Sequence, residues 1–118
     1  MKQKVFTIPL LPTSFELDCV IGGTRKQLIK HLATTYGEPK AYYDGIIVGP
    51  FCGIVRVNGF DKVILCTTND HIPVIAHEVV HATWKLDSLA GLNLDSRSQE
   101  TQAYYVSYIL IEILKNLR

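Results

Sequence analysis

The spacing of apolar side chains along the chain switches between period two and helical period, which predicts strands and helices together. Residues 4–8 have strand character, and residues 15–21 alternate apolar and polar positions. Residues 25–36 place apolar side chains at helical spacing, with Thr24 before them as N-cap and Gly37 after them. The first third of the chain therefore predicts two strands and one helix packed on a sheet.

The middle of the chain predicts a hairpin. Residues 45–48 form a short apolar run between glycines, a possible strand. Residues 52–57 and 62–67 are stronger strands, and the turn sequence at residues 58–61 begins with Asn-Gly.

Two helices are predicted in the C-terminal part of the chain. Residues 68–70 offer helix caps, and Pro73 suits the first turn of a helix that runs to about Leu86. A loop at residues 89–95 then leads to a helix at residues 97–117. The fold class expected is α+β, a small single domain over residues 1–118 with a β-sheet, one N-terminal helix and two C-terminal helices.

The first of these C-terminal helices carries His77-Glu78-Val79-Val80-His81. Two histidines four residues apart project from one face of a helix and can reach a single Zn²⁺. Glu78 lies at the edge of that face, where it can take a proton from a water molecule. The motif predicts a zinc hydrolase.

Glu100, on the last helix, is the candidate for a third ligand. A helical wheel places Ala103, Ser107, Leu110, Ile111 and Leu114 within about 80° of it, a stripe expected to be buried. A buried carboxylate needs a cation or hydrogen bonds, and zinc is a natural partner. The alternative is a glutamate that only complements the helix dipole.

The zinc motif, Glu100 and the following Ala103-Tyr104 resemble the zinc peptidases called gluzincins, closest to the minigluzincins and to short phage-encoded proteins. The resemblance covers about residues 70–110. Larger gluzincins usually carry Asp where this chain has Tyr104, so the surroundings of the ligands must differ. The metallopeptidase that cleaves repressors in bacteria and mobile elements is a weaker match, because its Glu-x-x-Ala usually continues with Asn.

The implied mechanism assigns a role to each residue. His77, His81 and Glu100 hold Zn²⁺, and Glu78 acts as the general base that activates water against a peptide bond. Tyr104 and Tyr108 are expected to stabilise the oxyanion, with His71 as an alternative, or to cap the core with hydroxyls in water. His31 is not a candidate.

The expected partner is a peptide or protein substrate. It is expected to pair with an exposed edge of the strand at residues 62–67 and to run past the metal. The phage-like resemblance implies an intracellular protein, acting in the host cytoplasm on a host or regulatory protein. The oligomeric state is open.

Composition excludes several other classes. The net charge is +1 and no basic run is present, so no nucleic-acid partner is expected. Neither a secretory leader nor an apolar stretch long enough for a membrane span is visible. Cys19, Cys52 and Cys66 are widely spaced, which predicts buried free thiols in a reducing compartment rather than a thiolate metal site.

Two alternatives to the peptidase remain. One is a catalytically silent zinc-binding protein that acts by binding a host protein, for which Glu78 would be dispensable. The other is a metal-free fold in which His77 and His81 are buried polar residues that need several hydrogen bonds.

Overall fold

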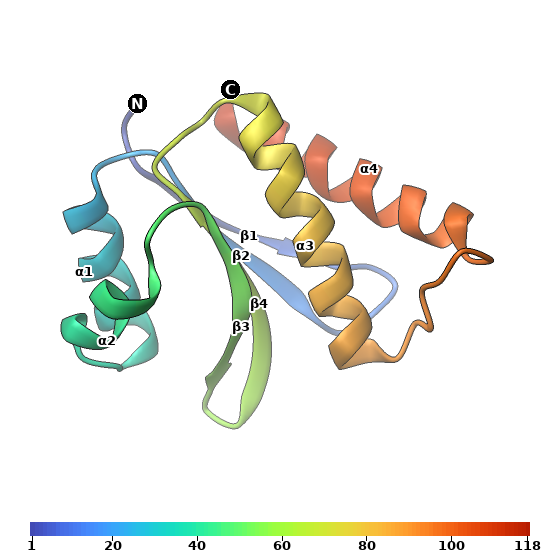
Figure 1. The fold of residues 1–118 in the computed structure, drawn as a ribbon, viewed down its shortest axis with the longest axis horizontal. Coiled ribbons are helices and arrows are strands. Elements are labelled where there is room, and N and C mark those ends of the chain that lie inside the picture. Colours follow the sequence, from blue (N-terminus) through green and yellow to red (C-terminus); the bar gives the residue numbers. More distant parts are fainter.

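Four strands form one mixed sheet through the middle of the molecule, with helices on both faces (Figure 1). The computed structural model describes every residue from 1 to 118. The strands are β1 (Lys4–Pro9), β2 (Glu16–Ile21), β3 (Phe51–Val57) and β4 (Phe60–Thr67). The helices are α1 (Arg25–Tyr36), α2 (Lys40–Ile46), α3 (Ile72–Ala90) and α4 (Gln99–Leu117).

The strands are ordered β1-β2-β4-β3 across the sheet. The pairs β1–β2 and β3–β4 are antiparallel, whereas β2 and β4 are parallel, with Leu17 opposite Val63 and Ile21 opposite Thr67. A parallel pair needs a crossover connection, and here the segment containing α1, α2 and β3 provides it. The two edges of the sheet are therefore β1 and β3, and β4 is paired on both sides.

The predicted hairpin between β3 and β4 turns at Asn58 and Gly59. Their φ angles are 52° and 82°, and Val57 pairs with Phe60 across the turn. Positive φ at both central residues matches the twist of the flanking strands, and Asn-Gly adopts it at low cost. The sequence prediction of this hairpin is confirmed, with β3 and β4 each starting slightly earlier than expected.

Alternation along the strands divides the core into two parts. Leu17, Cys19 and Ile21 of β2 face α3 and α4, while Val20 of the same strand faces α1 and α2. The larger core contains fourteen buried residues and the smaller one eight. The sheet is thus covered on both faces, and α3 and α4 lie on the face opposite α1 and α2 (Figure 1).

Helix α1 has the bounds that the sequence predicts. The Thr24 side chain accepts a hydrogen bond from the backbone of Gln27, whose side chain accepts one from the backbone of Thr24. The helix ends at Gly37, which has a φ of 86°.

The expectation of a single N-terminal helix is wrong, because α2 follows α1 directly. The predicted strand at residues 45–48 is also wrong, since residues 45 and 46 complete α2. Tyr43 and Ile47 are both 2% exposed and anchor this short segment in the smaller core. The gain from burying these two side chains outweighs the weak helix propensity of a seven-residue stretch that contains glycine.

The two C-terminal helices are confirmed with shifted ends. Helix α3 continues to Ala90, four residues beyond the expected end, and closes at Gly91 with a φ of 66°. Helix α4 starts at Gln99 and, in the view of Figure 1, runs from the right-hand side back toward the end where α3 begins. None of the four helices combines the length and the hydropathy needed to cross a lipid bilayer.

Candidate metal centre

One side of helix α3 packs in the core, and this determines where the side chains of the His77–His81 motif point. Its N-terminal end is fixed by Asn69, whose side-chain oxygen accepts a 2.8 Å hydrogen bond from the backbone N–H of His71. Its residues Ile75, Val79, Ala82 and Leu86 are all fully buried. Because helical residues turn by 100° each, His77 and His81 lie roughly 160° from Val79 on either side. Both imidazoles are exposed on the outer face of α3.

The two imidazoles converge on each other. Their Nε2 atoms are 3.1 Å apart, and their ring centroids are 4.8 Å apart with the planes at 71°. Two nitrogen ligands at 2.0–2.1 Å from a tetrahedral zinc ion stand about 3.3 Å from each other. The pair therefore already has nearly the separation that two corners of a zinc site require. The same contact is a hydrogen bond when one ring donates and the other accepts.

Glu78 differs from the two histidines in being buried, with 6% of its surface exposed. Its carboxylate forms no hydrogen bond or ion pair with another residue. It lines a hollow of about 410 Å³ together with Pro50, Pro73, Val74 and His77. Its oxygens are not buried atoms, so the hollow leaves the carboxylate open to solvent while the rest of the side chain is packed.

The negative charge of Glu78 also acts on a nearby thiol. Burial first, and then Glu78, raise the pKa of Cys52 to about 12, with Lys85 acting in the opposite direction. Cys52 is half-buried, whereas Cys19 and Cys66 are fully buried, and all three thiols are free. At neutral pH the Cys52 thiol is protonated, so it is a poor nucleophile beside the candidate base.

Glu100 does not lie in a buried stripe, and this expectation is wrong. Glu100 is exposed in the first turn of α4, and the helix buries Tyr105, Ile109 and Ile113 instead. No group of three or more His, Cys, Asp or Glu side chains comes together anywhere in the chain in a way that could hold a metal ion. The structure therefore joins His77 with His81 but does not bring Glu100 to them, and the third ligand stays a prediction.

The two candidate tyrosines brace α4 against the connection between β1 and β2. Tyr104 donates a 3.4 Å hydrogen bond to the carbonyl of Leu11, and Tyr108 donates one to the carbonyl of Pro9. The two rings stack, with centroids 5.9 Å apart and planes 9° apart. Neither hydroxyl forms a hydrogen bond with the zinc motif, so a role in stabilising an oxyanion stays a prediction.

His71 occupies the N-cap position of α3 but caps it with no side-chain hydrogen bond. Its side chain is exposed. His31, for which the sequence predicts no role in the site, forms a 3.3 Å contact with Thr35 on α1, on the opposite side of the sheet from α3. The four histidines thus divide into one converging pair and two separate residues.

The strand expected to offer a free edge does not have one. Strand β4 (Phe60–Thr67) is paired with β2 on one side and β3 on the other. The edge next to it is β3, which packs against α3. A sequence cannot show this, because a parallel β2–β4 pair brings together strands that are 46 residues apart at Leu17 and Val63.

Sequence analysis also missed an apolar surface beside the histidines. Val80 and Trp84 of α3 are 43% and 41% exposed. The signal for it was present, because α3 has apolar residues on all sides, and such a helix normally has its whole circumference covered. Here the outer side of α3 is open to solvent around the two histidines.

Comparison with known proteins adds no relative. No protein-family model, no curated protein and no solved structure matches the chain. The likeness to minigluzincins therefore depends on the His77–His81 motif and on Glu100 with the residues that follow it.

Proposed function

We propose that this chain is a zinc-dependent peptidase, a hydrolase of the endopeptidase type, with its site on the outer face of α3. The observation that carries the proposal is the 3.1 Å separation of the His77 and His81 Nε2 atoms on an exposed helix face. An i, i+4 histidine pair with an adjacent, buried glutamate is the arrangement that metal-assisted peptide hydrolysis uses.

Zinc, when bound, polarises a carbonyl and lowers the pKa of water enough for it to lose a proton near neutral pH. Glu78 is the residue that would accept this proton and deliver it to the leaving amine. Its carboxylate oxygens have no hydrogen-bond donor from the protein to compete with water, and it shares a hollow with His77. Although Glu78 as a whole is largely buried, its carboxylate oxygens stay accessible to solvent and can therefore reach a water molecule.

Glu100 is the proposed third ligand. The resemblance assigns it this role, and its carboxylate forms no hydrogen bond or ion pair, so it is free to bind a cation. Two histidines and one carboxylate are the ligand set of zinc hydrolases that keep one position open.

The outer face of α3 also offers a place for the substrate. Strand β3 is a free edge beside α3, and a peptide added there would gain main-chain hydrogen bonds. Val80 and Trp84 supply exposed apolar surface next to the histidine pair. The proposed substrate is thus an extended peptide or an unfolded segment of a protein. By its likeness to phage-encoded proteins, we place the activity inside a host cell.

A silent zinc-binding protein is the second candidate, and one observation favours it. The histidine pair is exposed and has no third metal-binding side chain near it, while apolar surface surrounds it. Such a face suits a protein partner as well as a substrate. In this case metal would brace α3 and Glu78 would have no chemical role.

Metal content and hydrolysis test the proposal in turn. Elemental analysis of protein purified without chelator or His tag should give about one zinc per chain, and much less for His77→Ala and Glu100→Ala. Zinc-loaded wild type should cleave unfolded casein or a peptide library, and Glu78→Gln should retain the metal but lose the cleavage. Equal cleavage by wild type and Glu78→Gln would overturn the peptidase. Absence of zinc even after it is supplied would overturn both candidates.

A further inference from the structure

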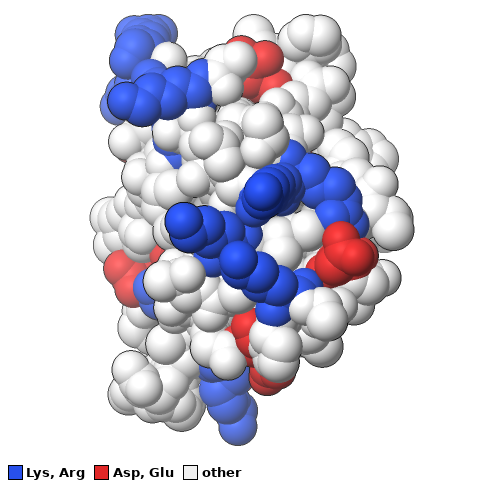
Figure 2. All heavy atoms as spheres, turned by 90° about the vertical axis from the view of Figure 1, so that its left-hand side faces the viewer, with Lys and Arg blue, Asp and Glu red and all other residues white.

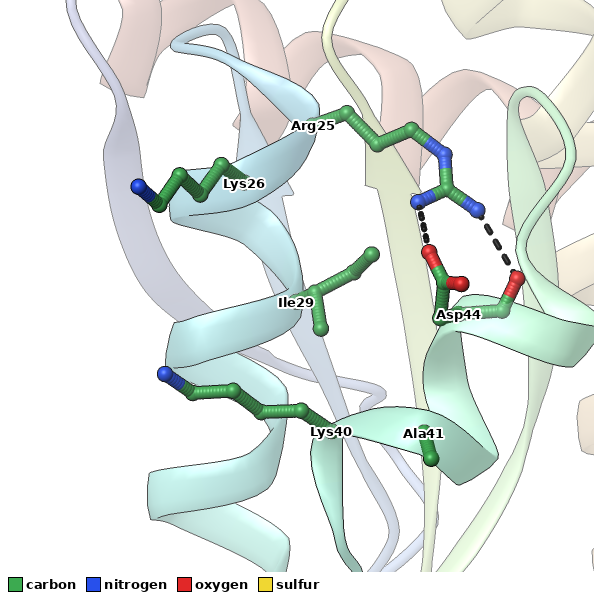
Figure 3. A pocket seen from close by; sticks show the side chains of 6 residues that line it. All are labelled: Arg25, Lys26, Ile29, Lys40, Ala41 and Asp44. Atoms are coloured by element: carbon green, nitrogen blue, oxygen red, sulfur yellow. Dashed lines mark hydrogen bonds and ion pairs between the residues drawn. The ribbon is translucent and has the colours of Figure 1, made fainter.

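A hollow of about 560 Å³ lies between α1 and α2, on the opposite side of the sheet from the histidine pair (Figure 3). Six residues line it: Arg25, Lys26, Ile29, Lys40, Ala41 and Asp44. Three of them are cations and one is an anion. The hollow forms where α2 folds back beside α1. Because the sequence does not predict α2, it does not predict this hollow either.

Arg25 builds the hollow rather than serving as a free charge. Its guanidinium donates a 2.7 Å hydrogen bond to Oδ1 of Asp44 and a 2.9 Å hydrogen bond to the Asp44 carbonyl, and it also donates to the carbonyl of Ile47. Figure 3 shows this bidentate contact along one wall. The only carboxylate of the hollow is already occupied.

Lys26 and Lys40 are the free charges. Neither forms a hydrogen bond or an ion pair in the chain, and both are exposed. In Figure 3 their ammonium groups extend to the same side, across the hollow from the Arg25–Asp44 contact, one from α1 and one from α2. The pair thus presents two unneutralised positive charges along one rim.

Positive side chains outnumber negative ones on this face. Figure 2 shows a group of Lys and Arg side chains in the middle of the side that α1 and α2 form, with Asp and Glu at its borders. Residues 24–44 contain four Lys or Arg and two Asp or Glu, so this segment carries +2 while the remainder of the chain carries −1. A field of one sign on one face steers partners of the opposite sign.

Between the charged rims the floor is apolar, formed by Ile29 and Ala41. We infer that this hollow is a docking site for an acidic segment of a partner protein. Carboxylates of the segment pair with Lys26 and Lys40, and an apolar side chain between them sits on Ile29 and Ala41. Protein interfaces usually have charged and polar contacts at the rim and apolar contacts at the centre.

A protein partner fits this surface better than a nucleic acid. A nucleic-acid footprint needs a long basic stripe on a strongly basic domain, whereas this chain has a net charge of +1. Only Lys26 and Lys40 are free cations at the hollow, which suits a short acidic segment rather than a continuous phosphate backbone. Because the hollow and the histidine pair lie on opposite faces of the sheet, this docking is independent of the proposed peptidase.

Fluorescence anisotropy with a labelled Glu-Glu-Leu-Glu-Glu peptide tests the inference on the full chain. Wild type should bind the peptide, more weakly as salt rises. Lys26→Glu/Lys40→Glu should weaken binding by about tenfold or more. Lys85→Glu/Lys115→Glu is the matched control: it changes the net charge equally, on the α3–α4 side of the sheet, and should change binding less than about twofold. Circular dichroism verifies that both variants are folded.

Two further probes make the outcome specific. A Glu-Glu-Ser-Glu-Glu peptide should bind more weakly than the leucine peptide if Ile29 and Ala41 form the floor. An oligothymidine of the same charge should bind no better than the peptide. Equal loss in the two charge-reversed variants, no binding by wild type, or clear preference for the oligothymidine would each overturn the inference.

Discussion

The hydroxyl of Tyr36 donates a 2.6 Å hydrogen bond to Oδ2 of Asp18, which ties the last turn of α1 to strand β2. Asp18 is only 8% exposed, and its other oxygen accepts a 2.8 Å hydrogen bond from Thr7 and a 3.2 Å contact from Lys62. A buried carboxylate is tolerated when its lone pairs are satisfied and a cation is near. Strands β1, β2 and β4 and helix α1 all contribute to this cluster, so it fixes α1 on the sheet.

Replacing Tyr36 by Phe should lower the free energy of unfolding by roughly 1.5–3 kcal/mol, the usual worth of a hydrogen bond to a charged group. Urea denaturation followed by circular dichroism measures it. Tyr42→Phe is the matched control, because Tyr42 is 52% exposed and its hydroxyl has no partner. Equal midpoints for Tyr36→Phe and wild type would show that Asp18 is satisfied without the tyrosine.

The buried thiols make stability depend on alkaline pH. The pKa values of Cys52 and Cys66 are raised from 9.0 to about 12, for each chiefly by burial. A folded chain that holds these protons more tightly than the unfolded chain has its full stability below pH 9, and it loses stability as pH rises toward 12. Between pH 9 and 10 each thiol should cost about 1 kcal/mol of unfolding free energy.

The comparison protein for this pH effect is Cys52→Ala/Cys66→Ala. Its stability at pH 8 will be lower because cavities remain, but the slope of unfolding free energy against pH between 9 and 10 should be shallower. Denaturant titrations at three pH values give both slopes. Parallel slopes would show that other groups cause the alkaline loss.

The local elements could be predicted from sequence, and their arrangement could not. Thr24 and Gly37 mark the ends of α1, and Asn58-Gly59 marks the hairpin, because caps and turns are decided by neighbouring residues. The parallel pairing of β2 with β4 depends on contacts between distant segments, which no local pattern encodes. Helix α2 escaped prediction because it is held by the burial of Tyr43 and Ile47 rather than by propensity.

In the candidate site, too, the local feature could be predicted and the one that depends on tertiary packing could not. The i, i+4 spacing of His77 and His81 predicts their convergence directly, since both lie on one helix. The orientation of Glu100 depended on which side of α4 faces the core. That helix carries apolar residues around most of its circumference. The helical wheel therefore predicted a buried side containing Ala103 and Ile111, whereas the structure buries Tyr105 and Ile109. The prediction failed because α4 has no clearly polar side, and without one a helical wheel cannot show which side is buried.

Zinc should raise the melting temperature of wild type. A ligand that binds only the folded state stabilises it by about 2.7 kcal/mol at a hundredfold excess over its dissociation constant. For a domain of this size that is on the order of 10 °C. Differential scanning fluorimetry with and without zinc measures the shift, and His77→Ala/His81→Ala should show none.

The Glu100→Ala variant in the same experiment decides the third ligand. A reduced zinc shift identifies Glu100 as a ligand that approaches the pair when metal binds. A shift as large as that of wild type would remove Glu100 from the site and favour the silent zinc-binding protein, in which the metal needs only α3 and solvent or a partner.

A substitution at Tyr108 distinguishes a structural role in holding α4 from the predicted role in stabilising an oxyanion. Tyr108→Phe loses the hydrogen bond to the Pro9 carbonyl and should lower the free energy of unfolding by about 1 kcal/mol. If the hydroxyl only braces α4, kcat and KM on a cleaved peptide will stay within twofold of wild type when measured well below the melting temperature. A large fall in kcat with unchanged KM would instead support the predicted oxyanion role.

Trp84 gives an optical test of the metal site without any substrate. It is the only tryptophan in the chain, it is 41% exposed, and it lies three residues after His81, close to one helical turn. A paramagnetic ion such as Cu²⁺, held by His77 and His81, would therefore lie near the indole and should quench its fluorescence in a saturable titration. Because Cu²⁺ binds nitrogen ligands more tightly than Zn²⁺, a large excess of zinc should be needed to restore the signal by competing for the same nitrogens. The His77→Ala/His81→Ala variant controls for collisional quenching, which rises linearly with copper and does not saturate. Saturable quenching that persists unchanged in this variant would place the copper elsewhere and would count against the histidine pair as its site.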